Sequence, residues 1–286
     1  MDGVAPAEGR NGMMAGGQQS QGITATDLTV GWQTRTIAKV PSLTVSPGSI
    51  IVVAGPNGAG KSTLVKTLAR QIAPLAGKIA IDGTDVTTFS ATAFARRVAY
   101  VPQMMNMLQD LTVAELVQLG RNPHQSWWSW KASDADAEAV AAALEGTGTT
   151  HLRSHFLSSL SGGERQRAAI AMALAQNASF ILLDEPTAHL DFKHQLELSD
   201  LIKSLAAQGI GLLLVLHDLN LMSRVADQIL FLKKGAAEFS TPTAYGGTAD
   251  VLRTEILRDV YDVEVQVFTD PISGQQNFVP TRVSTD

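Results

Sequence analysis

"GPNGAGKST", residues 55–63, decides the fold class, because it fits the phosphate-loop pattern G-x-x-x-x-G-K-[ST] in its proper context. An apolar run at 49–55 enters the loop as a strand, and a helix with Leu64, Leu68 and Ile72 on one stripe leaves it. The glycines let the backbone wrap around phosphate oxygens, so that amide N–H groups point inward at a helix N-terminus. The stretch therefore predicts a nucleotide-binding α/β domain.

Every residue of this loop is a candidate ligand of ATP. The set is Gly55, Pro56, Asn57, Gly58, Ala59, Gly60, Lys61, Ser62 and Thr63. Lys61 would reach the β- and γ-phosphates as a point charge, and the Ser62 hydroxyl would bind Mg²⁺. An ordinary glycine turn, the alternative, does not require a strand before it and a helix after it.

Composition and charge narrow the functional classes. The chain has 286 residues, 45% of them hydrophobic, which suits one large domain or one and a half. A net charge of −5 disfavours nucleic acid as a partner. The longest apolar runs, 49–55 and 210–216, are far shorter than the roughly 20 residues of a membrane-spanning helix. The absence of cysteine excludes disulfides and thiolate metal sites, which agrees with a cytoplasmic protein.

Short aliphatic runs alternate with helical stretches from Ile23 onward, which predicts an α/β domain with a largely parallel sheet. Strands are expected near 23–32, 40–45, 49–55, 77–82, 98–101, 179–184, 210–216 and 229–233, and helices near 112–121, 132–146, 162–176 and 248–261, before an alternating tail at 262–268. The expected segments are a disordered leader at 1–22, a β subdomain with the phosphate loop at 23–103, a helical subdomain at 104–176, the second half of the core at 177–240, and a C-terminal helix and tail at 241–286. The leader lacks the features of a secretory signal.

"FILLDEPT", residues 180–187, places two carboxylates directly after an apolar strand. Buried parallel strands are apolar throughout, and open α/β sheets bind ligands at the carboxyl ends of their strands. Successive residues of an extended chain point to opposite sides. We therefore expect Asp184 to face a metal ion beside Ser62 and Glu185 to face an attacking water. A strand followed by an acidic turn is the alternative.

Two further polar residues end strands of the same sheet. His217 follows the apolar run at 212–216 and would reach the same sheet edge, near a γ-phosphate. Gln103, in "YVPQ", follows a shorter strand and would contact Mg²⁺ or the water. A structural histidine and a loop glutamine are the alternatives for these residues.

A second glycine-rich helix start lies at 160–167, "LSGGERQR". Ser161 and Glu164 fit a capping box, which by itself would explain a helix start. Gly162 and Gly163, however, each cost about 1 kcal/mol relative to alanine in a helix. Two such losses suggest a close approach to the backbone, and a bare helix N-terminus favours an anion. Since the phosphate loop already holds one nucleotide, the anion is a second phosphate in this chain or one that belongs to another copy.

In this order, "GPNGAGKST", "YVPQ", "LSGGERQR", "ILLDEPT", "AHLD" and "LHD" resemble the nucleotide-binding subunit of an ATP-binding cassette (ABC) transporter, over about 23–280. The resemblance implies a P-loop NTPase fold with a RecA-like, mostly parallel core sheet, an antiparallel β subdomain and a helical subdomain. It also implies a homodimer of cassettes, in which each ATP lies between the phosphate loop of one copy and Ser161–Gly163 of the other.

The resemblance also assigns individual roles. Trp32 would stack on adenine, Asp191 would belong to the D-loop, Gln103 would sense the membrane partner and His217 would contact the γ-phosphate. An indole offers a stacking face, although a half-buried strand aromatic is the alternative for Trp32. The chain departs from the family pattern where Glu164 replaces the glutamine of LSGGQ and where "AHLD", with His189, replaces SALD.

Phrases outside these motifs, such as "GRNPH" at 120–124 and "AHLDFKHQLEL" at 188–198, are similar to the ATPases of importers for ferric siderophores, ferric citrate, haem and cobalamin. The resemblance implies an ATPase that energises import, foremost of iron chelates, from the cytoplasmic face of the cell membrane. Permease subunits in the membrane and a substrate-binding protein would be its partners. Trp127, Trp128 and Trp130 favour a partner-binding surface over an internal cluster.

Two other classes of protein use a phosphate loop. Soluble cassettes of translation or DNA repair usually duplicate the cassette or insert long coiled coils, and this sequence has one phosphate loop and no sustained heptads. A GTPase or small-molecule kinase is the second class, but the guanine-reading N-K-x-D pattern is absent and LSGG has no function there. The sequence therefore favours the transport ATPase.

Overall fold

The structure is a computed structural model of the chain, and it describes residues 22–103, 110–125, 133–188, 190–235, 239–271 and 274–283. Residues 1–21 of the expected leader, the three tryptophans Trp127, Trp128 and Trp130, and His189 lie outside these ranges. Within them, no helix is both long enough and apolar enough to cross a membrane.

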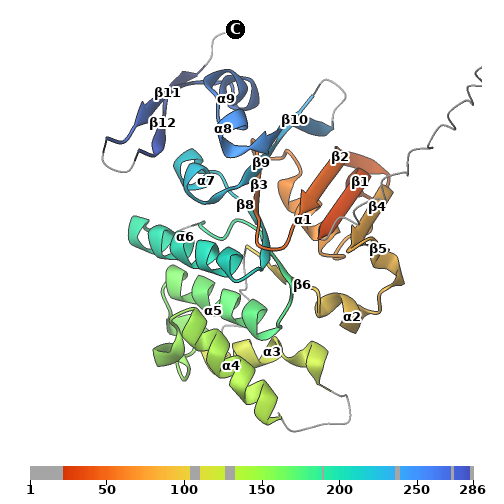
Figure 1. The fold of residues 1–286 in the computed structure, drawn as a ribbon, viewed down its shortest axis with the longest axis vertical. Coiled ribbons are helices and arrows are strands. Elements are labelled where there is room, and N and C mark those ends of the chain that lie inside the picture. The colour runs from red at the N-terminus through yellow and green to blue at the C-terminus, as the bar shows by residue number, and fades with distance from the viewer. Residues whose placement is uncertain are drawn as a thin grey trace, which may run out of the picture.

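A ten-stranded sheet forms the centre of the described structure, in the order β5-β4-β1-β2-β10-β9-β3-β8-β7-β6 (Figure 1). Its strands are β1 Ile23–Trp32, β2 Arg35–Val45, β3 Ile50–Ala54, β4 Ala76–Ile81, β5 Thr84–Asp85, β6 Val98–Val101, β7 Phe180–Leu183, β8 Gly211–Val215, β9 Gln228–Lys234 and β10 Ser240–Gly247. From β9 to β6 all neighbours are parallel, whereas β1 pairs antiparallel with β2 and β4. The predicted fold class, a mostly parallel core sheet with an antiparallel β region, is confirmed.

Helices flank this sheet, and a separate hairpin follows it. The helices are α1 Lys61–Leu68, α2 Ala91–Ala95, α3 Val113–Leu119, α4 Asp134–Gly146, α5 Gly162–Ala175, α6 Phe192–Ala207, α7 Leu219–Val225, α8 Thr248–Val251 and α9 Thr254–Tyr261, and the hairpin pairs β11 Val263–Thr269 with β12 Gln276–Val283. In Figure 1, α5, α4 and α3 lie together at the end of the molecule opposite α9 and the hairpin.

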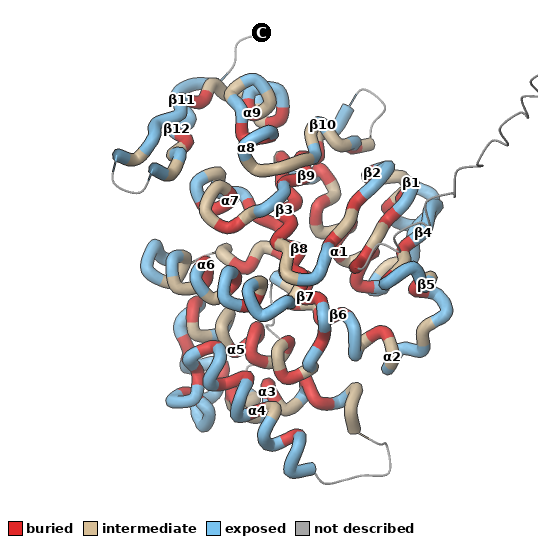
Figure 2. The backbone as a smooth tube through the Cα atoms, in the orientation of Figure 1, coloured by how far each residue is buried: buried red, intermediate tan, exposed pale blue. Residues whose placement is uncertain are grey.

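Strand β3 leads into the phosphate loop and is buried along its whole length. Ile50, Val52 and Ala54 join one hydrophobic cluster, with residues of α5, α6, α7 and α9, while Ile51 and Val53 join a second cluster that contains α1. This alternation is the period of two of a strand that is covered on both faces. Figure 2 shows the same concentration of buried backbone in the central strands. The phosphate loop therefore leaves the sheet from between two packed layers.

Helices α3, α4 and α5 share a third hydrophobic cluster, which contains Val113 and Leu116 of α3, Val140 and Leu144 of α4, and Ala168, Ala171 and Ala175 of α5. A buried ion pair joins the same helices: Arg121 Nε donates to Asp136 Oδ1 at 2.8 Å, and Arg121 Nη1 donates to the carbonyl of Ala175. The helical region that the sequence predicts thus has a core of its own in the described part.

Several expected elements differ in extent. Helix α1 ends at Leu68, and Ile72 lies beyond it, because Arg70 adopts a positive φ of 56°. The helix expected at 248–261 is two helices, since the backbone leaves the helical region at Leu252 and Arg253. The expected tail strand is β11, and its partner β12 was not predicted. Neither was β10, where "STPTAYGG" combines Pro242 at a bulge with two glycines.

Candidate functional site

The phosphate loop is held tightly between neighbouring strands. A Cβ atom on Gly55, whose φ is 139°, would lie 2.0 Å from the carbonyl oxygen of Leu232 in β9. A Cβ atom on Gly60, whose φ is 88°, would lie 2.6 Å from Ile37 Cγ2 in β2. Both positions require glycine, for conformation as well as for space.

Lys61 begins α1, and its side chain folds back over the loop. Its Nζ donates to the carbonyls of Gly55 at 2.9 Å and Pro56 at 3.0 Å, and the residue is only 4% exposed. Burial lowers the pKa of Lys61, and the nearby carboxylates of Glu185 and Asp184 oppose this effect. The Lys61 side chain is therefore placed at the loop, and no carboxylate of the described residues forms a direct ion pair with it.

Ser62 and Asp184 form the pair that the sequence predicts for Mg²⁺. Ser62 Oγ donates to Asp184 Oδ1 at 2.8 Å, and the Tyr100 hydroxyl lies 3.4 Å from Asp184 Oδ2. Burial raises the pKa of Asp184, while the hydrogen bond from Ser62 acts in the opposite direction. A hydroxyl and a buried carboxylate side by side are hard oxygen donors, so the residues present fit Mg²⁺.

Glu185 lies between two polar side chains that come from neighbouring strand ends. Gln103 Nε2, after β6, donates to Glu185 Oε2 at 2.7 Å, and His217 Nε2, after β8, lies 2.9 Å from Glu185 Oε1. Glu185 adopts a positive φ of 51°, which is uncommon for a residue other than glycine. With 23% of its side chain exposed, the carboxylate is accessible to water. The structure thus brings Gln103, Glu185 and His217 together.

Trp32 ends β1, opposite Arg35 in the register of the β1–β2 hairpin. The residue is 57% exposed, more than a half-buried strand aromatic would be. Its hairpin is also the one that brings Ile37 against Gly60. The indole is therefore available on the strand pair that borders the phosphate loop.

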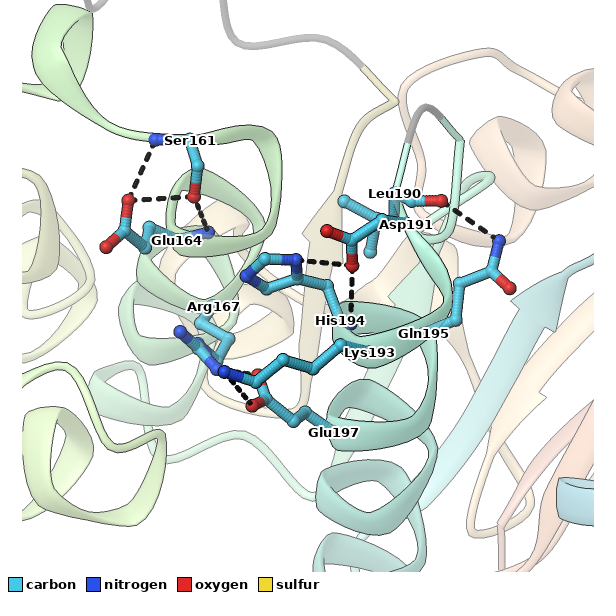
Figure 3. A network of polar contacts seen from close by, with 9 residues as sticks. All are labelled: Ser161, Glu164, Arg167, Leu190, Asp191, Lys193, His194, Gln195 and Glu197. Atoms are coloured by element: carbon cyan, nitrogen blue, oxygen red, sulfur yellow. Dashed lines mark hydrogen bonds and ion pairs between the residues drawn. The ribbon is translucent and has the colours of Figure 1, made fainter.

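The glycine-rich helix start is a complete capping box (Figure 3). Glu164 Oε2 accepts from Ser161 N at 2.8 Å and from Ser161 Oγ at 2.7 Å, and Ser161 Oγ accepts from Glu164 N at 3.3 Å. The hydrogen bond from the Ser161 side chain, followed by that from its backbone, lowers the pKa of Glu164. The carboxylate that departs from the family pattern is thus bound within its own turn.

The close approach expected at Gly163 comes from the same chain. A Cβ atom there would lie 2.4 Å from Cδ2 of the His194 ring. His194 belongs to the first turn of α6, where Asp191 is the N-cap: Asp191 Oδ1 accepts from His194 N at 2.9 Å and lies 2.7 Å from His194 Nδ1. Figure 3 shows the imidazole between Asp191 and the start of α5. The His194 ring therefore leaves no room for a side chain at position 163.

The two glycine-rich helix starts form separate hydrogen-bonded turns in the described part of the chain. Among the described residues, no hydrogen bond connects Ser161, Gly162 or Gly163 to the loop at 55–63. Asp191 likewise bonds to its own helix and not to the phosphate loop.

Three residues of this region were not predicted from the sequence: Tyr100, His194 and Tyr261. His194 has a local signal, since it stands three residues after an N-cap aspartate. Tyr100 lies on β6, three residues before the predicted Gln103. The apolar sequence around it gives no sign that its hydroxyl contacts a carboxylate. Tyr261 has no signal, because its partner Gly55 is 206 positions away.

Comparison with known proteins agrees with this geometry. A family model described as ABC transporter matches residues 38–188, more than half of the chain. The achromobactin transport ATP-binding protein of Dickeya dadantii is 40% identical over 251 residues, covering 87% of this chain and 91% of the relative. The ferric enterobactin transport ATP-binding protein of Escherichia coli is 38% identical over 255 residues, covering 88% and 92%.

Solved structures agree as well. A metal-chelate type ABC transporter in an inward-facing conformation matches with a TM-score of 0.78 at 28% identity, over 91% of this chain and 98% of that one. A dimeric bacterial ABC transporter cassette matches with a TM-score of 0.66 at 26% identity, over 79% and 98%. The chain belongs to the ATP-binding cassette (ABC) transporter family.

Proposed function

We propose that this chain binds ATP with Mg²⁺ in the loop at 55–63 and hydrolyses it with Glu185 as the general base. The observation that carries the proposal is the position of the Glu185 carboxylate. It is held by Gln103 and His217 and lies next in sequence to Asp184, which reaches Ser62 at the end of the loop. Glu185 is accessible to water, as a base that activates water must be.

Each residue of the site has a distinct task in this reaction. Glu185 accepts a proton from a water in line with the γ-phosphate, while His217 and Gln103 orient its carboxylate. Lys61 and the loop amides stabilise negative charge on the phosphate oxygens. Ser62 and Asp184 would hold Mg²⁺, which neutralises charge on those oxygens when bound. Trp32 would provide the stacking face for adenine.

We further propose that two copies complete each site. Ser161, Gly162 and Gly163 form a glycine-rich helix N-terminus that, among the described residues, makes no hydrogen bond to the phosphate loop of its own chain. Such a terminus attracts anions. The dimeric ABC cassette among the similar structures supports an arrangement in which this turn, with Asp191, faces the ATP of the partner. Gln103 would report ATP to a membrane subunit.

The proposed transport role is import of an iron chelate. It is supported by relatives that cover nearly the whole chain and carry the names of achromobactin and ferric enterobactin transport. The chain would act at the cytoplasmic face of the cell membrane, with permease subunits and a substrate-binding protein as partners. The proposed division places the β subdomain at 23–103, the helical subdomain at 104–176, the second half of the core at 177–240 and the C-terminal part at 241–286.

The test of hydrolysis is Glu185→Gln, which keeps the size of the side chain and removes the base. We expect the variant to bind ATP like wild type and to hydrolyse it about 10²- to 10⁴-fold more slowly. It should also accumulate as an ATP-bound dimer, measured by size-exclusion chromatography. Hydrolysis at the wild-type rate would show that Glu185 is not the base.

The test of the import role uses cells in which Glu185→Gln replaces the wild-type gene. We expect the uptake of radiolabelled ferric catecholate or ferric hydroxamate chelates to fall to background for at least one of them. If the variant cells take up every iron chelate of the panel at the wild-type rate but no longer take up radiolabelled cobalamin, the cargo is cobalamin and not an iron chelate.

A further inference from the structure

The C-terminal part of the chain lies outside the matched segment 38–188, yet it packs against the nucleotide site. Leu257 and Val260 of α9, Val265 of β11 and Phe278 of β12 are buried in the same hydrophobic cluster as β3 and β8. This part is therefore built into the core of the cassette beside the phosphate loop.

Tyr261, the last residue of α9, makes the direct contact. The backbone N–H of Gly55 donates to the Tyr261 hydroxyl at 3.1 Å. The Tyr261 ring meets the Phe231 ring of β9 edge to face, with centroids 6.1 Å apart. Gly55 has no side chain to anchor it, and its positive φ begins the loop. The hydroxyl thus fixes the peptide at which the chain leaves β3.

A second contact reaches the turn that carries His217. Asn220 Oδ1 accepts from the backbone N–H of Phe278 at 2.7 Å, and Asn220 Nδ2 donates to the carbonyl of Phe278 at 3.3 Å. His217 and Tyr261 line the same cavity, of about 400 Å³. The β11–β12 hairpin is therefore tied to the His217 turn while α9 is tied to the phosphate loop.

We propose that Tyr261 is a positioning residue for ATP binding, which holds the first peptide of the phosphate loop through its hydroxyl. Gly55 is buried, and a buried backbone N–H that loses its partner costs free energy comparable to a lost hydrogen bond. Without the hydroxyl, this peptide is free to rotate, and the loop no longer presents its amides to the phosphates in one fixed arrangement. The inference rests on the proposed binding of ATP at this loop.

Tyr261→Phe is the test, because it removes one oxygen and keeps the ring against Phe231. Tyr245→Phe is the control: the Tyr245 hydroxyl also bonds to a backbone, that of Thr44 at 3.4 Å, and it lies in a different part of the sheet. The affinity of each purified chain for a fluorescent ATP analogue, and its thermal unfolding midpoint, are measured.

We expect Tyr261→Phe to weaken nucleotide binding about 5-fold, as for one lost hydrogen bond. The Tyr245→Phe variant should bind the ATP analogue like wild type, even if its unfolding midpoint falls as much as that of Tyr261→Phe. Equal affinity of Tyr261→Phe and wild type would overturn the inference, and so would an equal loss in Tyr245→Phe. A wild-type chain that does not bind the analogue at all would instead contradict the proposed function.

Discussion

Glu164 replaces a glutamine at the third position of α5, and its carboxylate is turned back onto Ser161. Three hydrogen bonds close this turn, and glutamine can form the bond to the Ser161 N–H as well. We expect Glu164→Gln to change the free energy of unfolding by less than about 0.5 kcal/mol, and Glu164→Ala to lower it by about 1 kcal/mol. Chemical denaturation measures both. An equal loss in the two variants would mean that the charge, and not the capping box, stabilises the turn.

Gly163 and His194 form a second pair at the residue scale. Alanine is favoured over glycine in a helix by about 1 kcal/mol, but a methyl group at 163 would overlap the His194 ring. We therefore expect Gly163→Ala to destabilise the wild-type chain by about 1–3 kcal/mol.

The effect of Gly163→Ala on the free energy of unfolding should change sign when the His194 ring is absent. In a His194→Ala background, Gly163→Ala should be neutral or stabilising, and a double-mutant cycle by denaturant titration measures this coupling. Strictly additive effects would show that the ring does not restrict position 163. If glycine were required at position 163 only for the approach of a phosphate, the two substitutions would act additively.

At the scale of elements, the helical region depends on the Arg121–Asp136 pair, whose side chains are 10% and 7% exposed. Removing one member leaves a buried, uncompensated charge, so Asp136→Asn should lower the free energy of unfolding by about 3 kcal/mol. Asp134→Asn, in the same first turn, is the control and should cost less than about 0.5 kcal/mol.

The Arg121–Asp136 pair also predicts how the free energy of unfolding depends on pH. The hydrogen bond from Arg121 lowers the pKa of Asp136 from its usual 3.8 to about 2. Because the folded-state pKa is the lower one, the stabilisation is complete above about pH 4 and is lost as the pH falls towards 2. The difference in unfolding free energy between wild type and Asp136→Asn should therefore be constant from pH 7 to about 5 and should narrow towards pH 2. A difference that does not narrow would exclude ionisation of Asp136 as its source.

Local patterns were sufficient for most elements and for the polar residues at strand ends. β1 and β6 have the predicted bounds, and Gln103, Asp184, Glu185 and His217 meet because parallel strands end at one edge of a sheet. β2 begins five residues earlier than predicted, because Gln33, with a φ of 51°, makes a tight turn that its residue type does not indicate. Tyr261 was not predictable, since its contact depends on how α9 packs on a strand more than 200 positions earlier.

At the scale of the whole molecule, the two glycine-rich helix starts belong to different parts of the chain. The loop at 55–63 follows β3, whose two faces pack in two hydrophobic clusters, whereas Ser161–Gly163 starts a helix of the third cluster and contacts α6. No described hydrogen bond joins them. If a second copy completes each site, a symmetric dimer contains two sites. Each site then combines the loop of one chain with the Ser161–Gly163 turn of the other.

Two inactive variants should therefore restore activity to each other. Lys61→Ala removes the charge of the phosphate loop, and Ser161→Arg places a bulky side chain at the turn 161–163, called here the signature turn. In a heterodimer of the two, one site combines both defects, and the other combines an intact loop with an intact signature. We expect doubly tagged, purified heterodimers to reach up to about half of the wild-type ATPase rate, whereas each variant alone is inactive.

The control places both substitutions in one chain and pairs it with wild type. The shared-site arrangement then predicts no activity, because each of the two sites contains one defect. If each chain instead completed its own site, the outcome would reverse: the separate variants would stay inactive together, and the control heterodimer would retain the activity of its wild-type chain. ATPase rates of the two heterodimers, purified through two different affinity tags, therefore decide between a site within one chain and a site between two.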